Sequence, residues 1–346
     1  MTSRRTPRVS AGRRPLAGLL LVPALLLAAC GTDRPDPSDQ TRAPTVEADG
    51  SPVDAEAPLL IVATTSILGD IVQNLVGADA TVQVIMPPGA DPHSFQPSPE
   101  DGVALREADL VVANGLDLEE SLVDMLEAAA VDGANLFELG DALDPIEFQL
   151  ERPDDHEHDD DDHGPYDPHV WFDPIRMADG VHLLATQIAA VDTRLGVAEW
   201  EARGDAYAAE ILEVHAELEE MFATIPPERR ILVTNHDALG YLAHRYAFEV
   251  LGTVIPGAST QAETDPRSFS ALIEAVEQAQ VPAVFAENTD STRLAEQLAS
   301  EVIGRGDLQV EVVRIPTDAL GESGSGAETY LGLLRTTAGL IVDALA

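Results

Sequence analysis

The chain contains no lysine: its 20 basic residues are all arginines, and they stand against 61 acidic residues, for a formal net charge of −41. This balance argues against nucleic-acid binding, because phosphate contacts require clustered basic side chains. It favours a protein that tolerates or attracts cations. With 45% hydrophobic residues, the composition is that of a globular protein, so the charge does not by itself indicate disorder.

Cysteine is almost as scarce. The single Cys30 excludes an internal disulfide and a zinc site made of several thiolates. Arginines followed by a short apolar run at 16–27 are typical of a signal peptide, which we expect at 1–29. The Leu-Ala-Ala-Cys sequence that ends it resembles a bacterial lipobox, which implies cleavage before Cys30 and lipid on its sulfur. An ordinary signal peptide with a chance cysteine is the alternative.

The rest of the chain divides into a tether and two lobes. Residues 30–57, rich in Pro, Asp, Thr and Ser, are typical of a flexible tether. At 346 residues, the chain is long enough for two domains after it. Apolar runs typical of buried strands then alternate with helical segments, which indicates right-handed crossovers and mainly parallel sheets. The strands are expected at 59–64, 82–86, 109–113, 135–139, 231–234, 249–253, 283–287 and 310–315. A helix is expected at 118–129, between the third and fourth strands.

A long amphipathic helix interrupts this alternation. It is expected at 197–224 and ends at a pair of prolines. The predicted fold class is therefore α/β, with two parallel-sheet lobes at 58–196 and 225–346 joined by a long backbone helix.

Three of the nine histidines stand where parallel sheets bind ligands, beyond the carboxyl ends of strands. They are His93, His169 and His236, and Asp318 has an equivalent place in the last unit. The tripeptide Asp-Pro-His occurs twice, and a proline before the imidazole restricts the backbone as a preorganised ligand requires. Each position also has a plainer interpretation, as a solvated loop residue, a structural hydrogen-bonding group or an ordinary turn. Three other histidines fall inside expected helices: His182, His215 and His244.

Several motifs occur together and in order: Asp-Pro-His at 91–93, Asn-Gly-Leu at 114–116, Asp-Pro-His-Val-Trp at 167–171, Val-Thr-Asn-His-Asp-Ala at 233–238 and Ser-Thr at 259–260. They resemble the signatures of cluster A-I (ZnuA/TroA-like) solute-binding proteins, the metal-capturing lipoproteins of ABC importers for zinc, manganese or iron. The resemblance extends from Pro58 to the end of the chain. It implies two α/β lobes, a rigid linking helix and a four-ligand site between the lobes.

Carried over by position, the metal ligands implied by this resemblance are His93, His169, His236 and Asp318. Glu287 matches a glutamate near the family's site and is a weaker candidate. Three imidazoles and one carboxylate suit Zn²⁺, whereas Mn²⁺ prefers more oxygen donors. Manganese-specific relatives tend to carry a carboxylate where this chain has His236. We therefore expect Zn²⁺ as the transported ligand, with manganese or iron as the alternative.

A run of acidic residues and histidines at 154–163 precedes the second Asp-Pro-His motif. Its three histidines, His156, His158 and His163, are interpreted as a low-affinity collector that raises local zinc or passes it to His169. A solvated loop without such a role is the alternative.

Residues that orient the ligating imidazoles by hydrogen bonds are expected around them. A ligating imidazole needs its other N–H oriented by a carbonyl or carboxylate, and Asp91, Asp167 and Asp237 lie near enough in sequence. Trp171 is expected to pack behind His169 without touching the metal.

The resemblance implies a non-catalytic receptor. It would be extracytoplasmic, anchored to the membrane by lipid, monomeric, and served by an ABC permease and its ATPase. A zinc hydrolase, with the same histidines and Glu287 as base, is the main alternative. A closed four-ligand shell and the lack of a His-Glu-x-x-His motif argue against it. A surface adhesin would leave the metal residues without a purpose.

Overall fold

The computed structural model describes residues 58–148, 166–257, 259–262, 264–289 and 291–346. The signal peptide expected at 1–29, the lipidation expected at Cys30, the tether expected at 30–57 and the acidic loop at 154–163 lie outside the described residues. So do the histidines of that loop, His156, His158 and His163. Among the described residues, no helix combines the length and the apolar character needed to cross a membrane.

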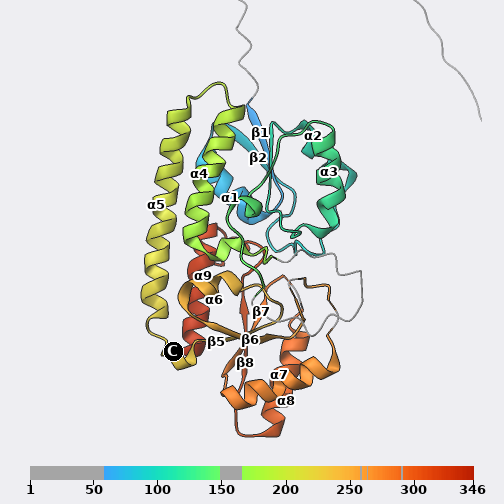
Figure 1. Ribbon diagram of the computed structural model, residues 1–346, viewed down its shortest axis with the longest axis vertical. Helices are drawn as coiled ribbons and strands as arrows, with labels where there is room; N and C mark the ends of the chain where they lie inside the picture. The colour runs from blue at the N-terminus through green and yellow to red at the C-terminus, as the bar shows by residue number, and fades with distance from the viewer. Residues whose placement is uncertain (1–57, 149–165, 258, 263, 290) are drawn as a thin grey trace, which may run out of the picture. The chain divides into compact units, whose positions relative to one another are not determined.

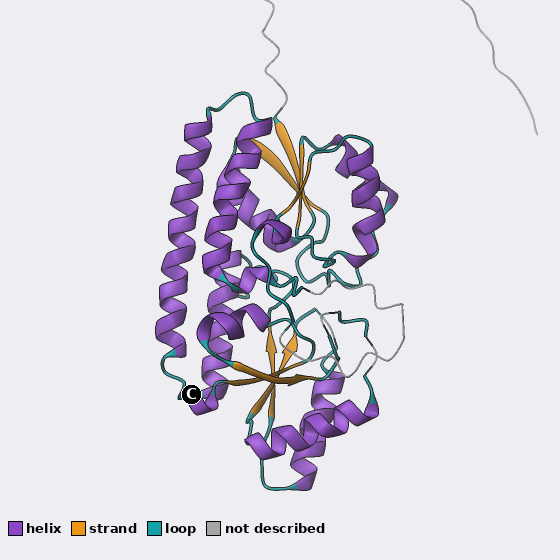
Figure 2. Ribbon diagram, viewed as in Figure 1, coloured by secondary structure: helices purple, strands orange, loops and turns teal. Residues whose placement is uncertain are grey.

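The first lobe is built on four parallel strands in the order β2-β1-β3-β4. Its central strands are apolar along their length because helices cover both faces of the sheet (Figure 2). Helices α2 and α3 pack on one face and α1 on the other (Figure 1). The elements are β1 (Leu59–Ala63), α1 (Ser66–Val76), β2 (Ala80–Val84), α2 (Pro99–Glu107), β3 (Leu110–Ala113), α3 (Val123–Val131) and β4 (Leu136–Glu138).

The second lobe repeats this arrangement with the strand order β6-β5-β7-β8, again all parallel. Helices α7 and α8 cover one face of this sheet, and α6 lies on the other. The elements are β5 (Ile231–Thr234), α6 (Gly240–Tyr246), β6 (Glu249–Thr253), α7 (Pro266–Ala279), β7 (Ala283–Glu287), α8 (Arg293–Arg305) and β8 (Glu311–Ile315). This confirms the expected fold class of two parallel-sheet α/β lobes.

Three helices connect the two sheets through one continuous hydrophobic core. Helix α4 (Pro174–Val191) packs along α5 (Val197–Phe222), the long helix expected at 197–224. The C-terminal helix α9 (Tyr330–Leu345) packs on α5, α1 and β8, so it contacts elements of both lobes. The shared core contains Ile61 of the first sheet, Ile211 of α5, Phe285 of the second sheet and Leu333 of α9.

Most strands agree with the sequence-based expectation to within one residue at each end, and β2 and α3 differ more. Strand β2 starts two residues earlier than expected because all five of its residues pair with β1, whose length sets the register. Helix α3 begins at Val123, not near Leu118, because the chain first makes a turn with positive φ at Gly115, Leu116 and Asp117. This turn bears directly on the candidate site, as shown below.

Asp173 ties helix α4 to helix α6. Its fully buried side chain caps the start of α4 by accepting a hydrogen bond from the backbone N–H of Ile175. It also accepts hydrogen bonds from Arg176 and, at 2.8 and 2.7 Å, from Arg245 of α6. Burial raises the pKa of Asp173, but the hydrogen bonds from the two arginines outweigh it, so the pKa lies below its ordinary value.

Replacing Asp173 by asparagine is expected to lower the free energy of unfolding by about 2 kcal/mol, because Arg176 and Arg245 both lose a charged partner. The two arginines are partly exposed, so the loss is smaller than for a fully buried ion pair. Because the folded-state pKa is depressed, the stability that this carboxylate contributes is present above the unfolded pKa of about 3.9 and is lost as the pH falls through the folded-state pKa. Denaturant unfolding of metal-free wild type and variant between pH 7 and pH 3 should show their difference shrinking with acid.

The control for this variant is Asp205→Asn, which breaks an exposed contact with His182 and should change the free energy of unfolding by less than about 0.5 kcal/mol. Equal losses in the two variants would contradict the role of Asp173.

Candidate metal centre

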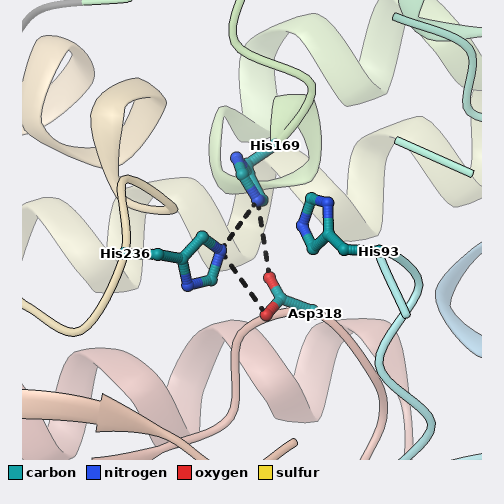
Figure 3. Close-up of side chains that lie close together, drawn as sticks. All are labelled: His93, His169, His236 and Asp318. Atoms are coloured by element: carbon teal, nitrogen blue, oxygen red, sulfur yellow. Dashed lines mark hydrogen bonds and ion pairs between the residues drawn. The ribbon is translucent and has the colours of Figure 1, made fainter. Parts of the chain in front are cut away.

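Four buried side chains from separate parts of the chain converge at one point. His93, His169, His236 and Asp318 each offer one nitrogen or oxygen atom, and these atoms all lie within 4.8 Å of one another (Figure 3). His93 follows β2, His169 follows the segment after β4, His236 follows β5 and Asp318 follows β8. His93, His236 and Asp318 therefore lie beyond the carboxyl ends of parallel strands, where such sheets bind ligands.

The spacing of these atoms suits a small cation. The Nε2 atoms of His169 and His236 are 3.3 Å apart, and they lie 3.6 and 3.8 Å from the two carboxylate oxygens of Asp318. Tetrahedral coordination with bonds of about 2.0–2.1 Å requires donor atoms about 3.3 Å apart. Nε2 of His93 and Oδ1 of Asp318 are buried without a hydrogen-bond partner among the described residues. Buried polar atoms of this kind are satisfied when they coordinate a metal ion.

Each imidazole has a carboxylate on the nitrogen that faces away from this point. Such a contact favours the proton on Nδ1 and leaves Nε2 as the metal ligand. The three contacts are His93 Nδ1 to Glu120 at 3.1 Å, His169 Nδ1 to Asp167 at 2.8 Å, and His236 Nδ1 to Glu287 at 2.9 Å.

These contacts agree only in part with the residues expected to orient the imidazoles. Asp167 and Glu287 contact imidazoles, but Glu120 does so in the place that Asp91 was expected to take. Asp91 instead accepts hydrogen bonds from the backbone N–H of His93 at 3.0 Å and from the hydroxyl of Thr260 at 2.7 Å.

Glu120 was missed because it lies 27 residues from His93 and was assigned to the interior of a helix. The turn at Gly115, where φ is 76°, brings this segment back against the sheet. Neighbouring Glu119 is buried there and accepts hydrogen bonds from the backbone N–H groups of Asn114 and Gly115, and burial raises its pKa. The side-chain amide of Asn114 donates to the carbonyl of Pro168 at 2.9 Å. One turn therefore supports both His93 and the backbone that precedes His169.

Asp167 is enclosed between the lobes. Burial raises its pKa to about 7, and burial together with the charge of Asp167 does the same for Asp237. Asp237 was a candidate for orienting an imidazole, but at His236 the carboxylate on Nδ1 is that of Glu287. Gly240, the first residue of α6, faces the carboxylate of Asp167 so closely that a Cβ atom would overlap it. A glycine at this position allows the second lobe to approach the acid that orients His169.

The imidazoles differ in their affinity for protons. Burial lowers the pKa of His169 well below its ordinary value, although Asp318 opposes this effect. Burial also acts to lower the pKa of His236, but the carboxylates of Glu287 and Asp318 outweigh it and raise the pKa to about 10. At neutral pH, His236 of the metal-free protein therefore carries a second proton, and its Nε2 faces the unprotonated Nε2 of His169.

The other histidines of the described chain lie outside this centre. His182 on α4 contacts Asp205, His215 on α5 contacts the hydroxyl of Tyr246, and His244 is exposed on α6. Trp171 packs edge-on against His169, with ring centroids 5.3 Å apart, in the place expected for it. Its indole N–H also donates a hydrogen bond to the carbonyl of Thr317 at 2.9 Å, a contact that sequence reasoning did not anticipate.

Comparison with known proteins gives a consistent result. A family model described as "Zinc-uptake complex component A periplasmic" matches residues 61–344. The chain is 29% identical over 327 residues to the manganese-binding lipoprotein MntA of Halalkalibacterium halodurans, covering 94% of this chain and 97% of that one. It is 30% identical over 305 residues to the zinc-binding protein TroA of Treponema pallidum, covering 86% and 90%. The solved structure of the periplasmic zinc binding protein TroA from Treponema pallidum matches with a TM-score of 0.73 at 28% identity, covering 83% of this chain and 99% of that one.

Metal binding at this centre is expected to release a proton, because a divalent ion must displace the proton on Nε2 of His236. With a metal-free pKa of about 10, the apparent affinity should rise about tenfold per pH unit between pH 6 and pH 8. Isothermal titration calorimetry in buffers with different ionisation enthalpies counts the protons released. His236→Gln should bind more weakly and lose most of this pH dependence; an affinity of the wild type that is independent of pH would contradict histidine ligation.

Proposed function

The chain belongs to the family of zinc-uptake complex component A proteins, the metal-binding receptors of ABC transporters, and we propose that zinc is the metal it captures and delivers to an import permease. The observation that carries this proposal is the donor set: three imidazole nitrogens and one carboxylate, all buried, with ligand atoms that lie within 4.8 Å of one another. Imidazole and carboxylate donors in this geometry are typical of Zn²⁺ sites.

The names of the relatives do not decide the metal, since relatives of similar identity are named for manganese and for zinc. The donor atoms favour zinc over manganese for two reasons. Three of the four ligating residues supply nitrogen, whereas Mn²⁺ is better served by oxygen. The intrinsic affinity of such a site also follows the order in which Zn²⁺ exceeds Mn²⁺. Manganese or iron is the second candidate, because both oxygens of Asp318 face the imidazoles and can raise the coordination number.

The same centre supports transport over catalysis. Four protein donors fill a tetrahedral shell and leave no position for a reactive water, which a catalytic zinc requires. Glu287, the base in the alternative hydrolase, contacts Nδ1 of His236, on the opposite edge of the ring from the donor atom. It is placed to orient a ligand. We therefore propose that the protein is not an enzyme.

The location of the receptor and its partners in metal delivery are inferred from the family and from the first 57 residues of the sequence. We propose that lipid on Cys30 anchors a monomeric receptor outside the cytoplasm, with 30–57 as its tether. The partners would be an ABC permease and its ATPase. Within the receptor we propose lobes at 58–196 and 225–346 and a linking helix at 197–224.

Zinc preference is tested by metal competition on metal-free protein starting at Pro58. The wild type should bind one zinc ion and retain it against an excess of manganese. The variant His236→Glu replaces an imidazole nitrogen donor by a carboxylate. It should weaken zinc binding by at least about tenfold and shift the metal preference towards manganese. His182→Gln, which changes a histidine outside the centre, is the control and should behave as the wild type. Retention of manganese in place of zinc by the wild type would overturn the assignment.

The acidic loop gives a separate prediction. Deleting 154–163 should leave the tight site intact, because none of its four ligands belongs to the loop. The deletion should slow zinc loading or remove weaker additional sites, which stopped-flow loading and metal stoichiometry measure. Replacing only His156, His158 and His163 by alanine separates the histidines from the acidic charge. If loading rate and stoichiometry stay unchanged in both variants, the loop has no role in zinc capture.

A further inference from the structure

The loop that carries Asp318 belongs to the second lobe by sequence, but the first lobe holds it on both sides. Before Asp318, the carbonyl of Thr317 accepts the indole N–H of Trp171 at 2.9 Å. After it, the backbone N–H of Leu320 donates to the hydroxyl of Ser66 at 3.0 Å, and the carbonyl of Leu320 accepts the N–H of Gly89 at 3.0 Å. These three contacts fix the backbone that aims the Asp318 carboxylate.

The Asp318 carboxylate itself has little direct support. Its Oδ2 accepts hydrogen bonds from Thr317 and Thr289, at 3.1 and 3.4 Å, and its Oδ1 has no hydrogen-bond partner among the described residues. Because these contacts are few and long, the direction of the carboxylate depends on the backbone on either side of it.

Trp171 links this loop to another donor. Its buried ring lies against His169 at 73° with 5.3 Å between centroids, and its N–H reaches the residue before Asp318. Its own carbonyl accepts the hydroxyl of Tyr330 at 2.8 Å, which fixes the backbone of the tryptophan. One side chain therefore contacts His169 of the first lobe and the loop of Asp318.

We propose that Trp171 is a positioning residue for metal capture, which holds the Asp318 loop in the frame of the first lobe through the Thr317 carbonyl. This inference rests on the proposed function, and it divides the four donors into two groups. His93, His169 and Asp318 are held together as one preformed set. His236, supported by Glu287 at the end of β7, is the donor that the second lobe supplies.

The test is Trp171→Phe, which keeps an aromatic ring beside His169 and removes the N–H that holds Thr317. Zinc affinity should fall by about tenfold or more, the range for residues that orient metal ligands, and zinc dissociation should become faster. The matched control is Trp200→Phe, which truncates the only other tryptophan, buried on α5 and packed under Arg203. It should lower stability to a similar extent and leave zinc affinity unchanged.

A double-mutant cycle separates positioning from general destabilisation. Because Trp171 acts through Asp318, Trp171→Phe should weaken zinc binding in the wild type but have little further effect when Asp318 is already alanine. Ser66→Ala removes the hydroxyl that accepts the backbone N–H of Leu320. It should weaken zinc binding when Asp318 is present and have little effect when Asp318 is alanine, and it replaces Trp171→Phe in the test if that variant does not fold. An unchanged affinity in both variants, or equal losses with and without Asp318, would overturn the inference.

The same titrations distinguish failure of the inference from failure of the proposed function. They are run with zinc and with manganese, and the metal that the wild type binds is used for the variants. If the wild type binds metal and Trp171→Phe binds it with the same affinity, only the positioning role of Trp171 is wrong. A wild type that binds neither metal defeats both.

Discussion

The structure buries a cluster of ionisable side chains where the loops of the two lobes meet. Three imidazoles, Asp318 and supporting carboxylates such as Asp167 and Glu287 are almost fully removed from water. Buried charges are tolerated only when they are paired, protonated or bound to metal. The pairing of each imidazole with a carboxylate answers this need on the Nδ1 side. On the other side only a proton or a metal ion can do so, and this makes the centre selective for cations.

Holding such donors in place requires a scaffold that moves little. The shared hydrophobic core runs from the first sheet through α4, α5 and α9 to the second sheet, so the lobes are joined by packing as well as by chain connections. Large opening would expose this core at a cost of about 25 cal/mol for each Å² of apolar surface. The contacts of Trp171, Ser66 and Gly89 with the loop of Asp318 add polar links across the same boundary. A large opening of the lobes is therefore opposed both by the shared core and by these polar links.

The fold class could be predicted from sequence because its signals are local, and position after loops and strands made four residues candidates, but their use as one ligand set was implied by the family resemblance. Apolar runs give the strands, and an Asp-Pro-His turn after a strand gives His93. Glu120 gave no such signal, since its contact with His93 depends on a turn of positive φ at Gly115 that the periodicity of the following segment concealed. Trp171 was expected to be buried, and it is. That its N–H would meet Thr317, 146 residues away, depends on how the two lobes dock.

The division between scaffold and donors allows one scaffold to carry different donor atoms, and relatives at similar identity are named for different metals. The positions of the donors are set by the supporting carboxylates, the turn at Gly115 and the shared core. None of these features determines whether the donor atom is nitrogen or oxygen. That choice lies in the proposed ligands themselves, and His236 is the position where a carboxylate would replace nitrogen by oxygen. The fold therefore positions the side chains of the site, while the identity of the metal is decided by a few donor atoms. In this chain the proposed donors are three nitrogens and one carboxylate.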